Sequence, residues 1–460
     1  MNGILAVLGL VLSVLIVLLV PDNGATAILI TLCLAAGGAF LIFRIGFDRT
    51  FLLQLFVGAL LLRMLIGTLI FVFQWQGFFG GDAYTYDFFG YAMLQSWEGD
   101  KFYQIVVNQF TATAGSGWGM LYLVAAVYKI IGRNPLAIQF TNAVLGAFTA
   151  IITYLTVQEI FDNQPVSRVA SMLVALFPSL VLWTSQGLKD GPIMFLLAMS
   201  MLATLKLGNR FSVKYLVILI FALFSLLTLR FYVFYMAAMA VGIAFLFGTK
   251  AMTAQSLARQ VIVIALIMTA FFYLGVTRYA GTQFETYGTR EMLQRTRADA
   301  ATSAESGFGR DVDVSTTEGA IGAIPLGFTY LMLAPFPWQM TSLRSLITLP
   351  EMIVWWSSLP ILCTGLWFSL KSRLRKILPI LIFTIMLTFS YSVFQGNIGN
   401  AYRQRAQLLI FYFIFTSAGF VLMKEKRAES ARIKQAKRQK ERAPVRLVSP
   451  ASTAVIDSQV

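Results

Sequence analysis

Apolar runs of about 20 residues recur along this 460-residue chain and limit its fold more than any other feature. A helix needs about 20 apolar residues to cross the hydrocarbon core of a bilayer, which is about 30 Å thick. Only 12% of the residues are charged, about half of what a soluble chain carries. We therefore predict an all-α, polytopic membrane protein with about 12 transmembrane helices. The suitable runs are residues 4–20, 25–43, 51–73, 136–157, 169–187, 190–206, 213–229, 231–248, 259–275, 352–370, 377–394 and 406–423.

Short basic loops set the expected orientation of these helices. With this number of spans, the basic loops all fall on the same side as both termini, at residues 44–49, 206–214, 250–259 and 371–376. The positive-inside rule assigns that side to the cytosol. We expect a multi-pass protein of the plasma (inner) membrane with both termini in the cytosol. The transmembrane domain would cover residues 1–423, with external segments at 74–135, 276–351 and 394–405.

The first apolar run has no Lys or Arg ahead of it and is long for the core of a signal peptide. We therefore expect it to be a retained helix. The sequence Ala25-Thr26-Ala27 leaves removal of a signal peptide open as an alternative.

Three external stretches have distinctive patterns. Trp118–Ile131 is apolar but short and contains Lys129, which favours an interfacial or re-entrant helix. Residues 325–340 contain three prolines and suggest a similar re-entrant segment. Residues 276–320 mix both charge signs with Gly, Ser and Thr, which is typical of a flexible loop or lid.

The net charge of +15 is concentrated near the C-terminus. Between Lys424 and Arg446 there are ten Lys or Arg against three Asp or Glu. We interpret residues 424–460 as a basic cytosolic tail, disordered or forming a surface helix, that could also contact anionic membrane lipid. No nucleic-acid-binding motif accompanies this charge, so we expect no nucleic-acid partner.

The chain contains no histidine, and this restricts its chemistry. A Ser-His-Asp triad is excluded, as are nearly all zinc sites. Cys33 and Cys363 both lie inside apolar runs and form neither a disulfide framework nor a metal cluster. Acid–base chemistry would therefore depend on carboxylates, Lys, Tyr or Cys.

The strongest local signal follows the third apolar run, in the sequence Gly80-Gly81-Asp82. The two glycines allow a tight turn as the chain leaves the membrane. Asp82 would then lie at the interface among aromatic residues that can stack on sugar rings, where it could act as a base. The alternative is an ordinary N-cap of the following helical segment.

The sequences GGDAYTYDFFGYAML and LFPSLVLWTSQGLKDGPIMFLLA resemble the GT-C superfamily over roughly residues 50–250. This superfamily comprises polytopic glycosyltransferases that use polyprenyl-phosphate-linked sugars, including protein O-mannosyltransferases and lipid A aminoarabinose transferases. The resemblance implies that Asp82 is the catalytic carboxylate and that Asp190 is the acidic residue of a later external turn. Asp87 would be a further supporting carboxylate. In many members the first motif follows the first helix, whereas here two more helices precede it.

Four cations are expected at external helix ends, where the positive-inside rule disfavours them: Lys189, Arg230, Arg403 and Arg405. A phosphate group would offset the cost of an unpaired cation, and Arg binds phosphate through two parallel donors. The alternative is that these side chains reach lipid headgroups or pair with Asp82, Asp190 or Glu351. The pair Glu98 and Asp100 could bind a divalent cation, although a solvated turn is the commoner meaning.

The resemblance implies a glycosyltransferase that moves a sugar from a polyprenyl-phosphate carrier to a glycan, lipid or protein acceptor on the outer face. No cofactor is required, no metal ligands are assigned, and a divalent cation is left open. Two alternatives remain. A polysaccharide polymerase or ligase would act on lipid-diphosphate-linked glycans through arginine, and a lipid-linked-sugar flippase or transporter would place ionisable residues at the membrane midplane.

Overall fold

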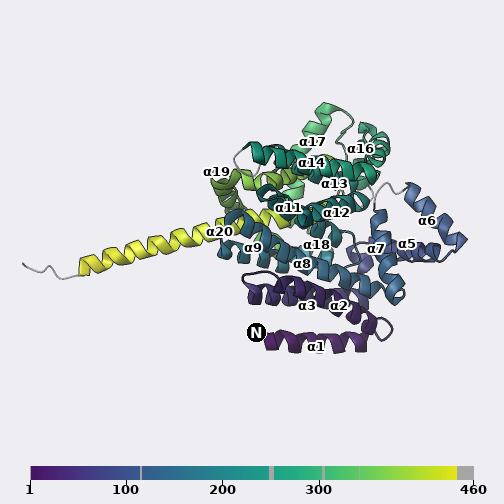
Figure 1. Ribbon diagram of the computed structural model, residues 1–460, viewed down its shortest axis with the longest axis horizontal. Helices are drawn as coiled ribbons and strands as arrows, with labels where there is room; N and C mark the ends of the chain where they lie inside the picture. Colours follow the sequence, from purple (N-terminus) through teal and green to yellow (C-terminus); the bar gives the residue numbers. More distant parts are fainter. Residues whose placement is uncertain (1, 114–116, 248–252, 303–305, 341, 443–460) are drawn as a thin grey trace, which may run out of the picture.

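The structure is a computed structural model that describes residues 2–113, 117–247, 253–302, 306–340 and 342–442. Every regular element in these residues is a helix, and the one strand-like pairing among them is a bridge between Gly307 and Asn397. The all-α prediction is confirmed. In Figure 1 most helices run along the long axis of a bundle, and α20 projects beyond one end.

The first helices of the chain are α1 (Asn2–Leu19), α2 (Gly24–Phe43), α3 (Arg49–Val72), α4 (Gln76–Phe79), α5 (Asp82–Trp97), α6 (Lys101–Thr113) and α7 (Trp118–Ile131). The middle of the chain forms α8 (Pro135–Phe161), α9 (Gln164–Leu176), α10 (Pro178–Thr184), α11 (Asp190–Asn209), α12 (Val213–Leu229) and α13 (Phe231–Phe247). The remainder forms α14 (Ala254–Tyr273), α15 (Val276–Tyr287), α16 (Arg290–Thr302), α17 (Thr317–Leu333), the 3₁₀ turn Pro337–Gln339, α18 (Leu343–Leu346), α19 (Leu349–Phe394) and α20 (Ile398–Arg442).

Among the described residues, seven helices are long and apolar enough to span a membrane, or up to nine if two bent pairs each count as one span. The predicted number of 12 is therefore not confirmed. Two features account for the difference. Helices α12 and α13 have only 17 residues each, and α19 contains two of the predicted runs, separated by a break at Arg373.

Helix α19 is 46 residues long and is interrupted at Arg373, whose backbone is not helical. Both of its halves pack on α20. The paired residues, in order along α19, are Trp355 with Tyr412, Gly365 with Phe415, Phe383 with Phe411, and Tyr391 with Gln407. The residue number of the partner on α20 increases along the first half of α19 and decreases along the second half. The halves are therefore antiparallel, and α19 is a helical hairpin.

The predicted basic loops meet at one end of the bundle, here called the basic end. The carboxylate of Glu159 accepts hydrogen bonds from Lys206 and Asn209, and its backbone carbonyl accepts one from Lys376 at 2.8 Å. Arg259 donates to the carbonyl of Gly208 at 2.8 Å. Figure 1 places the N-terminus and the projecting part of α20 at this same end, whereas α5, α6 and α7 lie at the opposite one. The side of the membrane that each end faces stays a prediction.

The predicted span 169–187 is a broken helix, in which α9 and α10 meet at an angle of 55°. Pro178 has no N–H, so the break leaves carbonyls of α9 without helical partners. The buried guanidinium of Arg63 fills this role: it donates to Ala175 O at 2.7 Å, to Val174 O at 3.3 Å, and to the hydroxyl of Thr184 at 2.8 Å. Arg63 thereby connects α3 to both halves of the break.

Two predicted loops differ from the structure. Residues 276–320, predicted as a flexible loop, contain α15, α16 and the start of α17, because their mixed charges lie on amphipathic helices. The predicted external loop 394–405 is shorter, since α20 begins at Ile398. The described part of the basic tail, residues 424–442, continues α20, and residues 443–460 lie outside the described residues.

Cysteine-accessibility labelling tests which end of the bundle faces the cytosol. After Cys33 and Cys363 are replaced by Ser, Thr302→Cys should react with an impermeant maleimide added from outside. Ser372→Cys, beside the break in α19, should react only after the membrane is permeabilised, because it lies at the basic end. Lys250, a second marker for that end, lies outside the described residues. Labelling of both cysteines from the same side would contradict the predicted orientation.

Candidate functional site

Arg403, near the start of α20, lies between two carboxylates from distant parts of the chain. Its Nη1 donates to Oδ2 of Asp82 at 2.7 Å, and its Nε donates to Oδ2 of Asp190 at 2.7 Å. Asp82 is the first residue of α5 and Asp190 the first residue of α11. The structure therefore brings together three predicted site residues at the starts of three helices.

Two further predicted cations belong to this group. Arg230 approaches Asp190, with 3.7 Å between Nη2 and Oδ1, and its side chain is only 8% exposed. Lys189 lies next to Asp190 in the chain, and its Nζ is 6.0 Å from the centre of the Tyr86 ring. We call the five residues Asp82, Lys189, Asp190, Arg230 and Arg403 the charge cluster.

The turn that carries Lys189 and Asp190 is held by α8, the most buried of the long helices. Nδ2 of Asn142 donates to the carbonyls of Gln186 and Leu188, both at 2.7 Å. Asn142 is completely buried, so these two bonds are shielded from water. Arg63 holds the preceding α10 through Thr184. The turn is thus fixed from α3 and α8.

The two carboxylates of the charge cluster differ in their access to solvent. The side chain of Asp190 is 0% exposed, whereas that of Asp82 is 52% exposed. Asp190 also accepts a hydrogen bond from Gln407 at 3.3 Å, so both of its oxygens are occupied. A buried carboxylate with these partners serves to hold the arginines, while Asp82 can be reached by another molecule.

Burial changes the protonation of two groups beside the cluster. Burial, together with the nearby Arg230, lowers the pKa of Lys189 to about 8. Burial, together with the nearby carboxylate of Asp82, raises the pKa of Tyr86, so its hydroxyl stays protonated at neutral pH.

The alternative role of Asp82 as an N-cap is not supported. The N-cap of α5 is Gly81, no side chain caps the helix there, and the Asp82 carboxylate is bonded to Arg403. Gly80 has a φ of 148°, a conformation that side-chain-bearing residues rarely adopt, so the turn before Asp82 requires glycine. The tight Gly-Gly turn expected from the sequence is present.

Arg405 does not join the charge cluster. It is 1% exposed, and its Nη1 donates to Ala334 O at 2.9 Å and to Met332 O at 3.2 Å, at the end of α17. Because α20 already includes Arg403 and Arg405, two residues apart, their side chains leave the helix in different directions. The sequence pattern had suggested a loop, in which both could point the same way.

Asp87 also lies in a separate network. It accepts hydrogen bonds from Tyr128 at 2.6 Å and from Arg133 at 2.5 Å.

Asp100 accepts a hydrogen bond from the backbone N–H of Phe102 at 2.8 Å and so caps the start of α6, which agrees with the interpretation of Glu98 and Asp100 as part of a turn.

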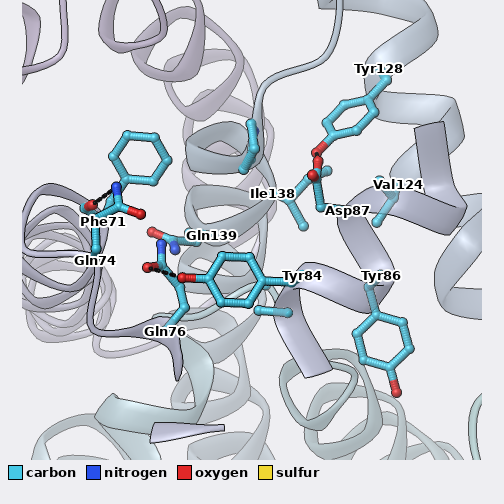
Figure 2. A pocket seen from close by; sticks show the side chains of 13 residues that line it. Phe71, Gln74, Gln76, Tyr84, Tyr86, Asp87, Val124, Tyr128, Ile138 and Gln139 are labelled. Atoms are coloured by element: carbon cyan, nitrogen blue, oxygen red, sulfur yellow. Dashed lines mark hydrogen bonds between the residues drawn. The ribbon is translucent and has the colours of Figure 1, made fainter. Parts of the chain in front are cut away.

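A cavity of about 210 Å³ lies beside α5 and borders the turn that carries Lys189 and Asp190 through Gly187. Figure 2 shows Tyr84 and Asp87 directed toward it, while Tyr86 leaves α5 in another direction. Its lining residues are Phe71, Gln74, Gln76, Ala83, Tyr84, Tyr86, Asp87, Val124, Tyr128, Pro135, Ile138, Gln139 and Gly187.

The geometry of the cluster does not suit a divalent cation between its carboxylates. The guanidinium of Arg403 already lies between Asp82 and Asp190 and neutralises them. Elsewhere in the part of the chain that the structure describes, no three His, Cys, Asp or Glu side chains gather in a way that could hold a metal ion.

Sequence reasoning missed several residues that support the site. Gln407 follows Arg403 by four residues, so the two share one face of α20, and this spacing could have been recognised. Tyr391 donates to Gln407 at 2.8 Å from the second half of α19. Asn142 and Arg63 are single polar residues in apolar helices, and no local pattern reveals their partners.

The comparison with protein families finds a match that covers part of this site. Residues 117–273, from the start of α7 to the end of α14, match the family described as dolichyl-phosphate-mannose-protein mannosyltransferase. The match confirms the predicted resemblance to the GT-C superfamily. The matched stretch includes Lys189, Asp190 and Arg230, whereas Asp82 and Arg403 lie outside it.

Similar solved structures include oligosaccharyltransferases of Archaeoglobus fulgidus. The apo form has 14% identity and a TM-score of 0.48, covering 83% of this chain and 52% of that chain. The AglB complex with an inhibitory peptide and a dolichol-phosphate has 13% identity and a TM-score of 0.40, covering 70% and 44%. A complex with Zn and sulfate has 16% identity and a TM-score of 0.41, covering 70% and 43%. The chain spans about half the length of these proteins. Among curated proteins, none matches in sequence.

Substitutions of the buried Asp190 and of the more accessible Asp87 should differ in their effect on the free energy of unfolding. Asp190→Asn leaves Arg403 and Arg230 buried without their shared negative partner, which should lower the free energy of unfolding by about 3–5 kcal/mol. Asp87→Asn removes a pair whose Arg133 side chain is 45% exposed and should cost about 1 kcal/mol or less. Unfolding of the purified proteins in mixed micelles gives both values. Equal losses would contradict the central position of Asp190.

Proposed function

We propose that the chain transfers a sugar from a polyprenyl-phosphate carrier to a hydroxyl or amine of a glycan, lipid or protein on the outer face of the plasma membrane. The carrier class is supported by the description of the matched family, because that description names a dolichyl-phosphate-linked sugar. Both the outer orientation and the identity of the membrane belong to this proposal.

Asp82 acts as the general base in this reaction. Its carboxylate takes the proton of the acceptor while the acceptor atom forms a bond to the anomeric carbon of the sugar. The bond between that carbon and the carrier phosphate breaks, and the polyprenyl phosphate leaves with the electron pair. Arg403 holds Oδ2 of Asp82 and orients the carboxylate, whose exposed side remains accessible to the acceptor.

The observation that carries the proposal is the surplus of cations in the charge cluster. Its three cations outnumber its two carboxylates, and Arg403 is occupied by both carboxylates. Nη1 of Arg230 is buried without a hydrogen-bond partner, and Lys189 has neither a hydrogen bond nor an ion pair within the described residues. These donors are available to the oxygens of the leaving phosphate, where negative charge develops in the transition state.

The alternative functions have less support. A flippase would need ionisable residues facing a path at the midplane, but Arg63, the buried cation of α3, is bonded to backbone carbonyls of α9. Arg405, one candidate arginine for a polymerase or ligase, is bonded to carbonyls of α17 in the same way. Arg403, the other arginine of the segment 394–405, is paired with Asp82.

Substitution of Asp82 tests the proposed base. Asp82→Asn keeps the size of the side chain but cannot take a proton, so transfer should fall by at least about a hundredfold. Thermal stability should change little, because the carboxylate is half exposed and the amide oxygen can still accept a hydrogen bond from the guanidinium of Arg403. The measurement is transfer of radiolabel from polyprenyl-phosphate mannose to membranes from cells that lack the gene. An Asn variant with wild-type turnover would remove Asp82 from the mechanism.

The pKa of Lys189 gives the phosphate site a pH dependence. With a pKa of about 8, its amine is charged at pH 7 and neutral at pH 9. A phosphate monoester has its second pKa near 6, so the ligand charge is constant over this range. Affinity for polyprenyl phosphate should therefore fall about tenfold from pH 7 to pH 9.

Lys189→Arg provides the matched control, because arginine stays charged throughout this range. In that variant the affinity for polyprenyl phosphate in nanodiscs should no longer decline. A decline that persists in Lys189→Arg would assign the titration to another group.

A further inference from the structure

The cavity beside α5 has a chemistry that differs from the charge cluster. We propose that it binds an uncharged sugar ring, belonging either to the lipid-linked donor or to a glycan acceptor. This inference deepens the proposed function and rests on it for the connection to catalysis. The binding itself follows from the size, polarity and charge of the cavity lining.

The size of the cavity suits a single ring. Its volume of about 210 Å³ is below the range of about 300–1,000 Å³ that is typical of drug-sized ligands. The enclosing elements are the end of α3, the start of α4, α5, α7 and the start of α8, together with Gly187 from the turn before α11. A disaccharide or a peptide would have to extend beyond this space.

The polar groups of the lining suit hydroxyl groups. Gln139 is 2% exposed, and its Oε1 has no hydrogen-bond partner among the described residues, although a buried amide oxygen without a partner is costly. Gln76, 5% exposed, makes only a long contact of 3.5 Å with the hydroxyl of Tyr84. In Figure 2 the amides of Gln76 and Gln139 and the ring of Tyr84 face the same space. Amides both donate and accept, as sugar hydroxyls do.

The charge of the lining selects against phosphate. Asp87 is the only carboxylate in the lining, and Arg133 neutralises it while Tyr128 donates to it. No cation lines the cavity. A phosphate group would thus meet a carboxylate here but free cationic donors at the charge cluster. The ring of Tyr84 adds an aromatic face, 48% exposed, on which a sugar can stack.

The cavity adjoins the proposed catalytic residues. Ala83 and Gly187 both line it, and Ala83 follows Asp82 directly in the chain. A Cβ placed on Gly187 would lie 4.0 Å from the Cβ of Ala83. The turn that carries Lys189 and Asp190 therefore borders both the cavity and the charge cluster. A sugar bound in the cavity would lie close to both Asp82 and the phosphate donors.

Binding can be measured without turnover, by saturation-transfer difference NMR on the full-length protein in nanodiscs. The probes are the methyl glycosides of mannose, glucose, galactose and N-acetylglucosamine. At least one should give a signal with the wild-type protein. Gln139→Leu removes the unpaired amide and should weaken the binding of that glycoside about three- to tenfold.

Two further variants make the result specific. Tyr84→Ala should also weaken binding, and it is expected to fold because the ring is half exposed. Gln54→Leu makes the same Gln-to-Leu change near the start of α3, away from the cavity at the end of that helix, and Gln54 forms an exposed hydrogen bond to Asn2 there. This control variant should bind the glycoside normally. No signal from any glycoside, or a signal unchanged in both Gln139→Leu and Tyr84→Ala, would overturn the inference.

Kinetics then distinguish the source of the sugar. If the ring belongs to the donor, Gln139→Leu should raise the KM for polyprenyl-phosphate mannose, and if it belongs to the acceptor, only the acceptor KM should rise. Asp82→Asn separates the inference from the proposed function, since it should retain glycoside binding while losing transfer. Glycoside binding in a protein without transferase activity would contradict the proposed function alone, whereas transfer without sensitivity to Gln139 or Tyr84 would contradict the inference alone.

Discussion

The bridge that Arg403 forms between Asp82 and Asp190 is the interaction on which the site depends. It joins the starts of α5, α11 and α20, which are separated by long stretches of sequence. Asp190 is fully buried, so its charge has to be matched inside the protein, and Arg403 and Arg230 supply the match. The partly exposed Asp82 then uses the remaining donor of Arg403. The accessible carboxylate is therefore oriented by a pair that is itself anchored in the core.

The buried arginines of this protein fall into two groups with different partners. Arg63, Arg297 and Arg405 donate to backbone carbonyls at a helix break or at the ends of helices. Each donates to carbonyls that have no partner within their own helix. Arg230 and Arg403 meet a carboxylate instead. The arginines that donate to carbonyls hold the backbone in place. The arginines that pair with carboxylates form the charged site at one end of the bundle.

Hydrophobic length predicted most of the helices because the bilayer imposes a single length scale on every span. It predicted the hairpin of α19 as two runs separated by the basic loop 371–376. It could not predict the break at Pro178, whose geometry depends on contacts with Arg63. Lys189, Arg230 and Arg403 could be chosen from sequence because the positive-inside rule disfavours cations at the helix ends predicted to be external. Asp82 was marked by the Gly-Gly-Asp sequence and by the resemblance to the GT-C superfamily, and Asp190 by the resemblance alone. Arg405 was grouped with Arg403 because the start of α20 was taken for a loop. Gln139 gave no signal, since a single amide in an apolar helix acquires its meaning only from the cavity beside it.

The turn between α10 and α11 organises two environments that a lipid-linked sugar would require. On one side, cations outnumber carboxylates, and on the other, amides and an aromatic ring surround a space with a neutralised carboxylate. A sugar phosphate has the same division, with charge at one end and hydroxyl groups at the other. Asn142 and Arg63 hold the turn through bonds buried in the bundle, so the two environments keep a fixed separation. Such a fixed separation favours the reacting geometry, because positioning of the reacting groups accounts for a large share of catalysis.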